Sequence, residues 1–127
     1  MIRLICGRSR SGKTTYSKQF DNVLHLDAFG IMPNNYNKLL EKVRKTDNDL
    51  VIDGVYDTAK LRTDLLNAYN NGGGKICIWI DTPLDIIKSR FYIVPSKHPY
   101  PFESPTLDEG WDEIIIVRGD EIERISR

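Results

Sequence analysis

The chain alternates short apolar runs with amphipathic segments. Five of the apolar runs have the length of a strand, and they lie at 2–6, 23–26, 50–52, 76–80 and 114–117. The run at 76–80 is apolar throughout, which is typical of a central strand covered on both faces. The pattern therefore predicts five strands, one of them fully buried.

Segments with apolar residues three and four positions apart lie between these runs. They predict helices over 13–20, around 36–43, over 61–68 and from 83 to 91. Residues 94–110 are rich in proline and polar side chains and predict no regular element, and a charged tail follows residue 117. Strands that alternate with helices predict an α/β fold with a central parallel sheet of about five strands flanked by helices. We expect residues 1–127 to form one domain.

Four of the predicted strands are each followed directly by a residue suited to ligand binding: Gly7, Asp27, Asp53 and Asp81. Because parallel strands place their carboxyl ends at the same edge of the sheet, these residues should share one edge. In sheets of this type, that edge is where ligands bind.

The clearest motif lies between the first predicted strand and the first predicted helix. Residues 7–14 match the pattern G-x-x-x-x-G-K-[ST] in full. Glycines let the backbone N–H groups of such a loop form a nest for anions, and the following helix points its positive end at the phosphates. The motif therefore predicts a P-loop that binds ATP or another nucleoside triphosphate, through Gly7, Arg8, Ser9, Arg10, Ser11, Gly12, Lys13, Thr14 and Thr15.

Within this loop, Lys13 is expected to reach the β- and γ-phosphates, and the Thr14 hydroxyl to bind Mg²⁺. Asp53 is a second candidate for the metal, although Asp53-Gly54 is also a common turn dipeptide. Asp27 could accept the proton of an attacking hydroxyl, and a turn or helix-capping role is an equal alternative. Asp81 is expected to cap the helix that follows it.

Phosphoryl transfer also needs a cation that follows the migrating charge. Arg90, at the end of the predicted helix 83–91, is the candidate, with a solvated arginine at a helix end as the alternative. His25, His98, Trp111 and Tyr92 are expected to be structural.

The composition of the chain bears on whether it binds nucleic acid or a membrane. The 18 basic and 18 acidic residues cancel, which argues against a chain that coats nucleic acid non-specifically and leaves room for a local basic groove. The apolar stretches fall short of the ~20 residues of a membrane span, so we expect a cytoplasmic protein with no membrane partner. Cys6 and Cys77 lie in apolar runs and are expected to be buried, reduced thiols.

A longer stretch near the end of the chain resembles a known family. Residues 102–114, read as F-E-S-P-T-L-D-E-G-W-D-E-I, are similar to the F-E-x-P-x-x-x-E-G-F-x-x-I stretch of the polynucleotide 5′-hydroxyl kinases. Val94-Pro95 is similar to the Val-Pro that follows the lid in that family. Together with the P-loop, Asp27 and Arg90, the resemblance covers nearly the whole chain.

The resemblance implies ATP-dependent phosphorylation of the 5′-hydroxyl end of DNA or RNA, with Asp27 as general base and Arg90 as a lid arginine. Two positions depart from the family: Val94 stands where a second lid arginine is usual, in a shortened lid, and Gly30 where some members carry an arginine that contacts the acceptor's phosphate. A phosphatase or ligase would have to be a separate repair partner. The alternatives are a kinase of a nucleoside or other small hydroxyl compound, and a nucleotide-binding regulatory ATPase.

Overall fold

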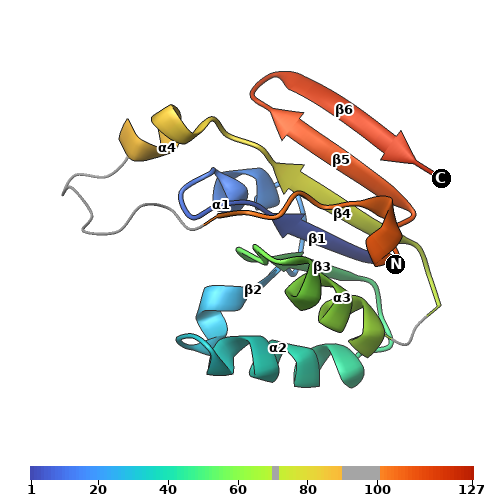
Figure 1. The fold of residues 1–127 in the computed structure, drawn as a ribbon. Coiled ribbons are helices and arrows are strands. Elements are labelled where there is room, and N and C mark those ends of the chain that lie inside the picture. Colours follow the sequence, from blue (N-terminus) through green and yellow to red (C-terminus); the bar gives the residue numbers. More distant parts are fainter. Residues whose placement is uncertain (70–71, 90–100) are drawn as a thin grey trace.

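The computed structural model describes residues 1–69, 72–89 and 101–127. Its centre is a six-stranded sheet with the order β2-β3-β1-β4-β5-β6 (Figure 1). The strands are β1 (Ile2–Cys6), β2 (Leu24–His25), β3 (Leu50–Asp53), β4 (Lys75–Ile80), β5 (Glu113–Arg118) and β6 (Glu121–Ser126).

The first five strands are parallel, as the sequence predicts. In the centre of the sheet, Leu4 of β1 is paired with Ile52 on one side and with Cys77 on the other. The sixth strand corrects the prediction, because the segment expected to be a charged tail pairs antiparallel with β5. Gly119 and Asp120 form the tight turn between the two strands, and Gly119 has a φ of 62°.

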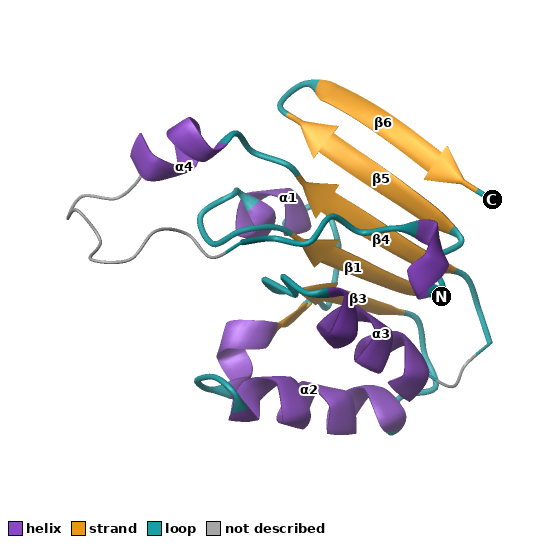
Figure 2. Cartoon of the chain, viewed as in Figure 1, coloured by secondary structure: helices purple, strands orange, loops and turns teal. Residues whose placement is uncertain are grey.

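Helices cover both faces of the sheet (Figure 2). They are α1 (Lys13–Ser17), α2 (Asn34–Arg44), α3 (Ala59–Ala68) and α4 (Leu84–Ser89), with short 3₁₀ helices at Leu26–Phe29 and Leu107–Glu109. The larger apolar cluster joins α2 and α3 to one face of the sheet through residues such as Leu39 and Leu65. On the other face, Tyr16 and Phe20 pack against a smaller cluster that includes Ile78.

Two elements near the loop differ from their predicted extent. The helix expected over 13–20 ends at Ser17, and Phe20 closes a turn by donating its N–H to the Ser17 carbonyl over 3.0 Å. The strand expected over 23–26 is reduced to Leu24–His25, and the 3₁₀ helix that follows it contains Asp27. Asp27 thus lies in a helical turn, two residues beyond the end of β2.

The buried residues follow the sequence predictions. Cys6 and Cys77 are both buried and unbridged, with their Sγ atoms 3.5 Å apart across β1 and β4. Trp111 is fully buried, in agreement with its expected packing role. Among the described residues, no helix is long and apolar enough to cross a membrane.

Candidate functional site

The loop between β1 and α1 is held tightly against the end of β4. A Cβ at Gly7 would lie 2.7 Å from both the Ile80 carbonyl oxygen and Ser11 Oγ, so a larger residue does not fit there. Within the loop, the Ser11 N–H donates to the Arg8 carbonyl over 3.1 Å. The Thr82 hydroxyl, just after β4, donates to the Ser11 carbonyl. The shape of the loop is therefore fixed by contacts on both of its sides.

Lys13 is the first residue of α1 and is almost buried, with 9% of its surface exposed. Its ammonium donates to the Arg8 carbonyl over 2.7 Å, which folds the side chain back over the loop. Burial lowers the pKa of Lys13, while the negative charges of Asp53 and Asp27 oppose that shift. The loop therefore carries a positive charge close to two carboxylates.

Asp53, at the end of β3, joins the loop to β2. The Thr14 hydroxyl donates to Asp53 Oδ2 over 3.5 Å, and His25 Nδ1 lies 3.1 Å from the same oxygen. The carboxylate is buried, with 5% of its surface exposed. The sequence predicts a structural role for His25 and does not indicate its contact with Asp53. The contact arises because His25 and Asp53 end neighbouring strands in register, and no sequence signal places those strands side by side.

Two cavities meet at this loop. The first, of about 280 Å³, is lined by the loop, by Asp27, by Asp53 and by Asn35 and Tyr36 of α2. The second, of about 380 Å³, is lined by Arg10, Gly12, Lys13, Thr14 and Thr15. Arg10, Lys13 and Thr14 line both cavities. The structure thus brings the predicted loop residues, Asp27 and Asp53 to one edge of the sheet.

Arg10 adopts a backbone conformation that is unusual for its residue type. Its φ is 62°, in the left-handed region where glycine or asparagine is favoured. A non-glycine residue in this region costs on the order of 1 kcal/mol, and such residues gather at functional sites. Arg10 is exposed and lines both cavities.

The other predicted residues either lie outside the described part of the chain or make contacts elsewhere. Arg90 lies outside the described residues, as do Val94, His98 and Tyr92. Asp81, which is expected to cap the following helix, accepts a hydrogen bond from Arg118 Nε over 3.0 Å. This contact ties the end of β4 to β5.

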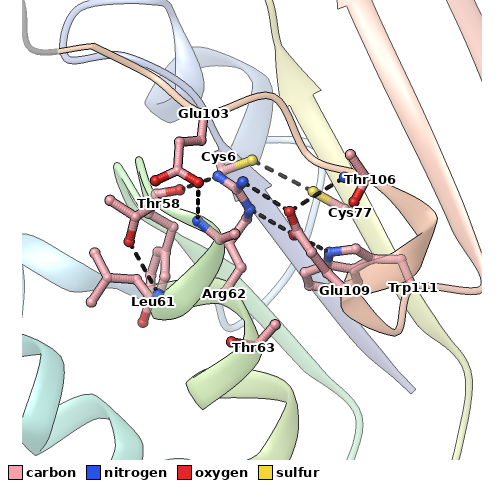
Figure 3. Close-up of polar contacts among 12 residues, drawn as sticks. Cys6, Thr58, Leu61, Arg62, Thr63, Cys77, Glu103, Thr106, Glu109 and Trp111 are labelled. Atoms are coloured by element: carbon pink, nitrogen blue, oxygen red, sulfur yellow. Dashed lines mark hydrogen bonds and ion pairs between the residues drawn. The ribbon is translucent and has the colours of Figure 1, made fainter.

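The segment that carries the family resemblance is part of a buried network (Figure 3). Arg62 of α3 is fully buried and donates to both carboxylate oxygens of Glu109, over 2.8 Å from Nε and over 3.0 Å from Nη2. Glu109 also accepts from Trp111 Nε1 over 3.0 Å and from the Thr106 N–H over 3.3 Å. Burial alone would lower the pKa of Arg62, but the hydrogen bonds and charge of Glu109 outweigh it and raise the pKa.

Phe102 connects this network to the loop between β1 and α1. Its ring is stacked on Trp79 of β4 at 5.8 Å between centroids. The guanidinium of Arg62 lies 5.6 Å from the ring centroid, and that of Arg8, in the loop, lies 5.9 Å from it. Both distances are within the range of a cation–π contact. Residues 102–114 therefore contact the loop through Phe102 and Arg8, and they line neither of the two cavities.

Gly30, the position at which some members of the resembled family carry an arginine, is close to another cation. Lys38 of α2 places its ammonium 4.0 Å from where a Cβ on Gly30 would lie. Side chains on a helix tilt toward its N-terminus, which brings Lys38 back over this loop. Sequence reasoning missed Lys38, because its position on the helix carries no motif.

Comparisons with known proteins support the fold. No family model matches the chain, and no curated protein matches it significantly. Among solved structures, it is similar to an unliganded crystal structure of a sugar kinase from Janibacter sp. HTCC2649, with a TM-score of 0.63 and 15% sequence identity. The match covers 92% of this chain and 84% of that chain. The chain therefore shares the α/β fold of that kinase.

Proposed function

We propose that this protein is a kinase that transfers the γ-phosphoryl group of ATP, or of another nucleoside triphosphate, to the 5′-hydroxyl end of a DNA or RNA strand. The observation that carries the proposal is the meeting of two cavities at Lys13 and Thr14, with Asp27 exposed in the first of them. A phosphoryl transferase needs this arrangement of a donor site beside an acceptor site, with a carboxylate on the acceptor side.

On the donor side, the proposed roles follow from charge. The phosphate-binding loop would hold the triphosphate through its backbone N–H groups, and the Lys13 ammonium would leave the Arg8 carbonyl for the β- and γ-phosphates. Burial strengthens this interaction, because a charge in a poorly solvated site acts at a lower effective dielectric. The negative charges of Asp53 and Asp27 help to keep the ammonium protonated before the nucleotide binds.

The residues beside the loop fit Mg²⁺. Thr14 Oγ1 and Asp53 Oδ2, 3.5 Å apart, are both hard oxygen ligands, which magnesium prefers. Among the described residues, no group of three or more His, Cys, Asp or Glu side chains could hold a metal by itself. Magnesium commonly binds through one or two protein oxygens plus the phosphates of its nucleotide, so these two residues suffice. The metal would neutralise charge on the β- and γ-phosphates.

On the acceptor side, Asp27 would orient the attacking hydroxyl and take its proton. The hydroxyl oxygen forms a bond to the γ-phosphorus as the bond from that phosphorus to the β,γ-bridging oxygen breaks, and the nucleoside diphosphate leaves with the electron pair. Arg90 is proposed to follow the migrating charge from the lid. Arg10, which lines both cavities, is a second cation close to the same path.

Two observations favour a nucleic acid end as the acceptor. One is the sequence resemblance of 102–114, whose Phe102 and Glu109 support the loop. The other is Lys38, whose ammonium lies beside Gly30 and could contact the phosphate that follows the first nucleoside.

A small hydroxyl compound is the second candidate. It is favoured by the lining of the first cavity, where Leu26, Met32 and Val55 stand beside the polar Asn35 and Tyr36. A mixed lining of this kind suits a small ligand. The neighbouring structure is also titled a sugar kinase.

A panel of acceptors tests the proposal. The protein is incubated with γ-labelled ATP, Mg²⁺ and either a 5′-hydroxyl oligonucleotide, the same oligonucleotide with a 5′-phosphate, a nucleoside 3′-phosphate, a free nucleoside or a simple sugar. The proposal expects label on the 5′-hydroxyl oligonucleotide and the nucleoside 3′-phosphate, and none on the 5′-phosphorylated strand. Equal labelling of the free nucleoside or the sugar would favour the second candidate.

A further inference from the structure

The mouth of the first cavity carries an unusual exposed apolar pair. Ile31 and Met32 are 85% and 68% exposed, and they lie in the short segment between the 3₁₀ helix at Leu26–Phe29 and α2. Met32 also lines the cavity, so the pair extends its wall outward. An apolar contact at this place suits the flat face of a base that follows the one held in the cavity.

Beyond this pair, α2 presents a basic face. Lys38 and Lys42 of α2, and Lys45 directly after its last residue, are all exposed, and their spacing of four and three places them on one side of the helix. Among the residues of α2, all of which the structure describes, Glu41 is the one acid, and it is paired with Arg44 over 2.7 Å. The three lysines therefore keep a local positive charge on a chain whose formal net charge is zero.

The basic face is continuous with the cavity. Asn35 and Tyr36, in the first turn of α2, line the cavity, and Lys38 reaches back to Gly30, two residues before Met32 of the cavity wall. An α-helix rises about 1.5 Å per residue, so Lys42 lies roughly 6 Å and Lys45 roughly 10 Å further along the axis than Lys38. This length corresponds to a few nucleotides of a single strand.

We propose that the acceptor strand leaves the cavity over Ile31 and Met32 and then runs along α2, with its phosphates against Lys38, Lys42 and Lys45. This path rests on the proposed function, because it assumes that the acceptor is a nucleic acid strand whose 5′-hydroxyl lies at Asp27. It names the surface that the strand uses, and it limits that surface to the first three or four nucleotides. A solvated helix face with no ligand is the alternative.

The path is tested by comparing acceptors of two lengths. A nucleoside 3′-phosphate ends before Lys42, whereas a 5′-hydroxyl octanucleotide would pass Lys45. KM for each is measured over a series of salt concentrations, for the wild type and for the variant Lys42→Ala/Lys45→Ala. The control is Lys75→Ala, which removes the same kind of charge at the start of β4, at the opposite edge of the sheet.

Each phosphate contact on a single strand contributes about 0.7 to the slope of log affinity against log salt. The double variant should therefore lose about 1.4 of that slope for the octanucleotide and raise its KM on the order of tenfold near 0.1 M salt. KM for the nucleoside 3′-phosphate should change less than twofold, as should both values in Lys75→Ala. Melting temperatures measured in parallel establish that each variant is folded.

The outcomes separate the path from the function. An octanucleotide that is phosphorylated with the same KM and salt slope in the double variant as in the wild type overturns the path and leaves the kinase function standing. Labelling of small hydroxyl compounds without any labelling of oligonucleotides overturns the function, and the path with it. An octanucleotide-specific loss in the double variant supports both.

Discussion

Removing the carboxylate of Glu109 should lower the stability of the protein strongly and leave its phosphoryl transfer reaction unchanged. The Glu109 side chain is 6% exposed and accepts four hydrogen bonds, two of them from the fully buried guanidinium of Arg62. In Glu109→Ala, that guanidinium would stay buried and would keep its hydrogen bond to the Tyr56 carbonyl, at 2.8 Å, but would have lost its charged partner. Breaking a buried pair by removing one partner costs about 3–5 kcal/mol.

For a chain of 127 residues, that loss corresponds to a fall in melting temperature on the order of 10–20 °C. Circular dichroism or calorimetry measures it, and urea unfolding gives the free energy directly. The double variant Arg62→Met/Glu109→Leu removes both charges and should recover most of the loss, because an apolar pair of similar volume is tolerated in place of a buried ion pair. Asp108→Ala, an exposed neighbour in the same turn, is the matched control and should change stability by less than about 0.5 kcal/mol.

The same variants distinguish support from catalysis. Glu109→Gln keeps the shape of the side chain, and assayed well below its melting temperature it should retain near-normal phosphoryl transfer. A melting temperature of Glu109→Ala within about 3 °C of the wild type would refute the stabilising role. A folded Glu109→Gln protein without transfer activity would show that the segment takes part in the reaction.

The remaining predictions concern the loop and the acceptor. Lys13→Ala should abolish transfer in a folded protein, and normal turnover would contradict the assignment of the loop. Asp27→Asn should lower kcat by on the order of 10²–10⁴-fold while ATP affinity, measured by calorimetry, stays unchanged; a collapse of ATP binding instead would make Asp27 structural. Arg10→Gly should raise the melting temperature slightly, because glycine relieves the φ of 62°, and should lower kcat more than Arg10→Lys does. Equal activity of Arg10→Gly and the wild type would remove Arg10 from the site. Arg90→Ala should strongly lower kcat for phosphoryl transfer, and full activity of this variant would show that another cation acts in place of Arg90.

Much of the sheet could be predicted because its signals are local. Each strand from β1 to β5 is a short apolar run, and the ends of these runs correctly place Gly7, Asp27 and Asp53 at one edge of the sheet. The loop motif is equally local, and its first glycine is required because a larger residue does not fit at Gly7.

The last strand could not be read from hydrophobicity. All six residues of β6 are exposed, and Ile122 and Ile125 are three positions apart, which is not the period of a strand. The strand is held instead by backbone pairing with β5 and by ion pairs such as Arg118 with Glu123 at 2.9 Å. The turn dipeptide Gly119-Asp120 was the one local sign of a hairpin.

Several site contacts depend on the fold and leave no mark in the sequence. His25 meets Asp53 because β2 and β3 are neighbours, and Lys38 meets Gly30 because α2 folds back beside the loop that precedes it. The pair of Arg62 and Glu109 joins residues 47 positions apart. Nothing in the spacing of these residues indicates such contacts, which arise only when the chain is packed.

The most direct test of the central claim is the transfer of label from γ-labelled ATP to a 5′-hydroxyl oligonucleotide, with the position of the new phosphate mapped by mass spectrometry. The wild type should place one phosphate on the 5′ oxygen in the presence of Mg²⁺, and folded Asp27→Asn should do so on the order of 10²–10⁴-fold more slowly. Failure to label the strand by a wild-type protein that binds ATP, or equal rates in the two proteins, would contradict the account.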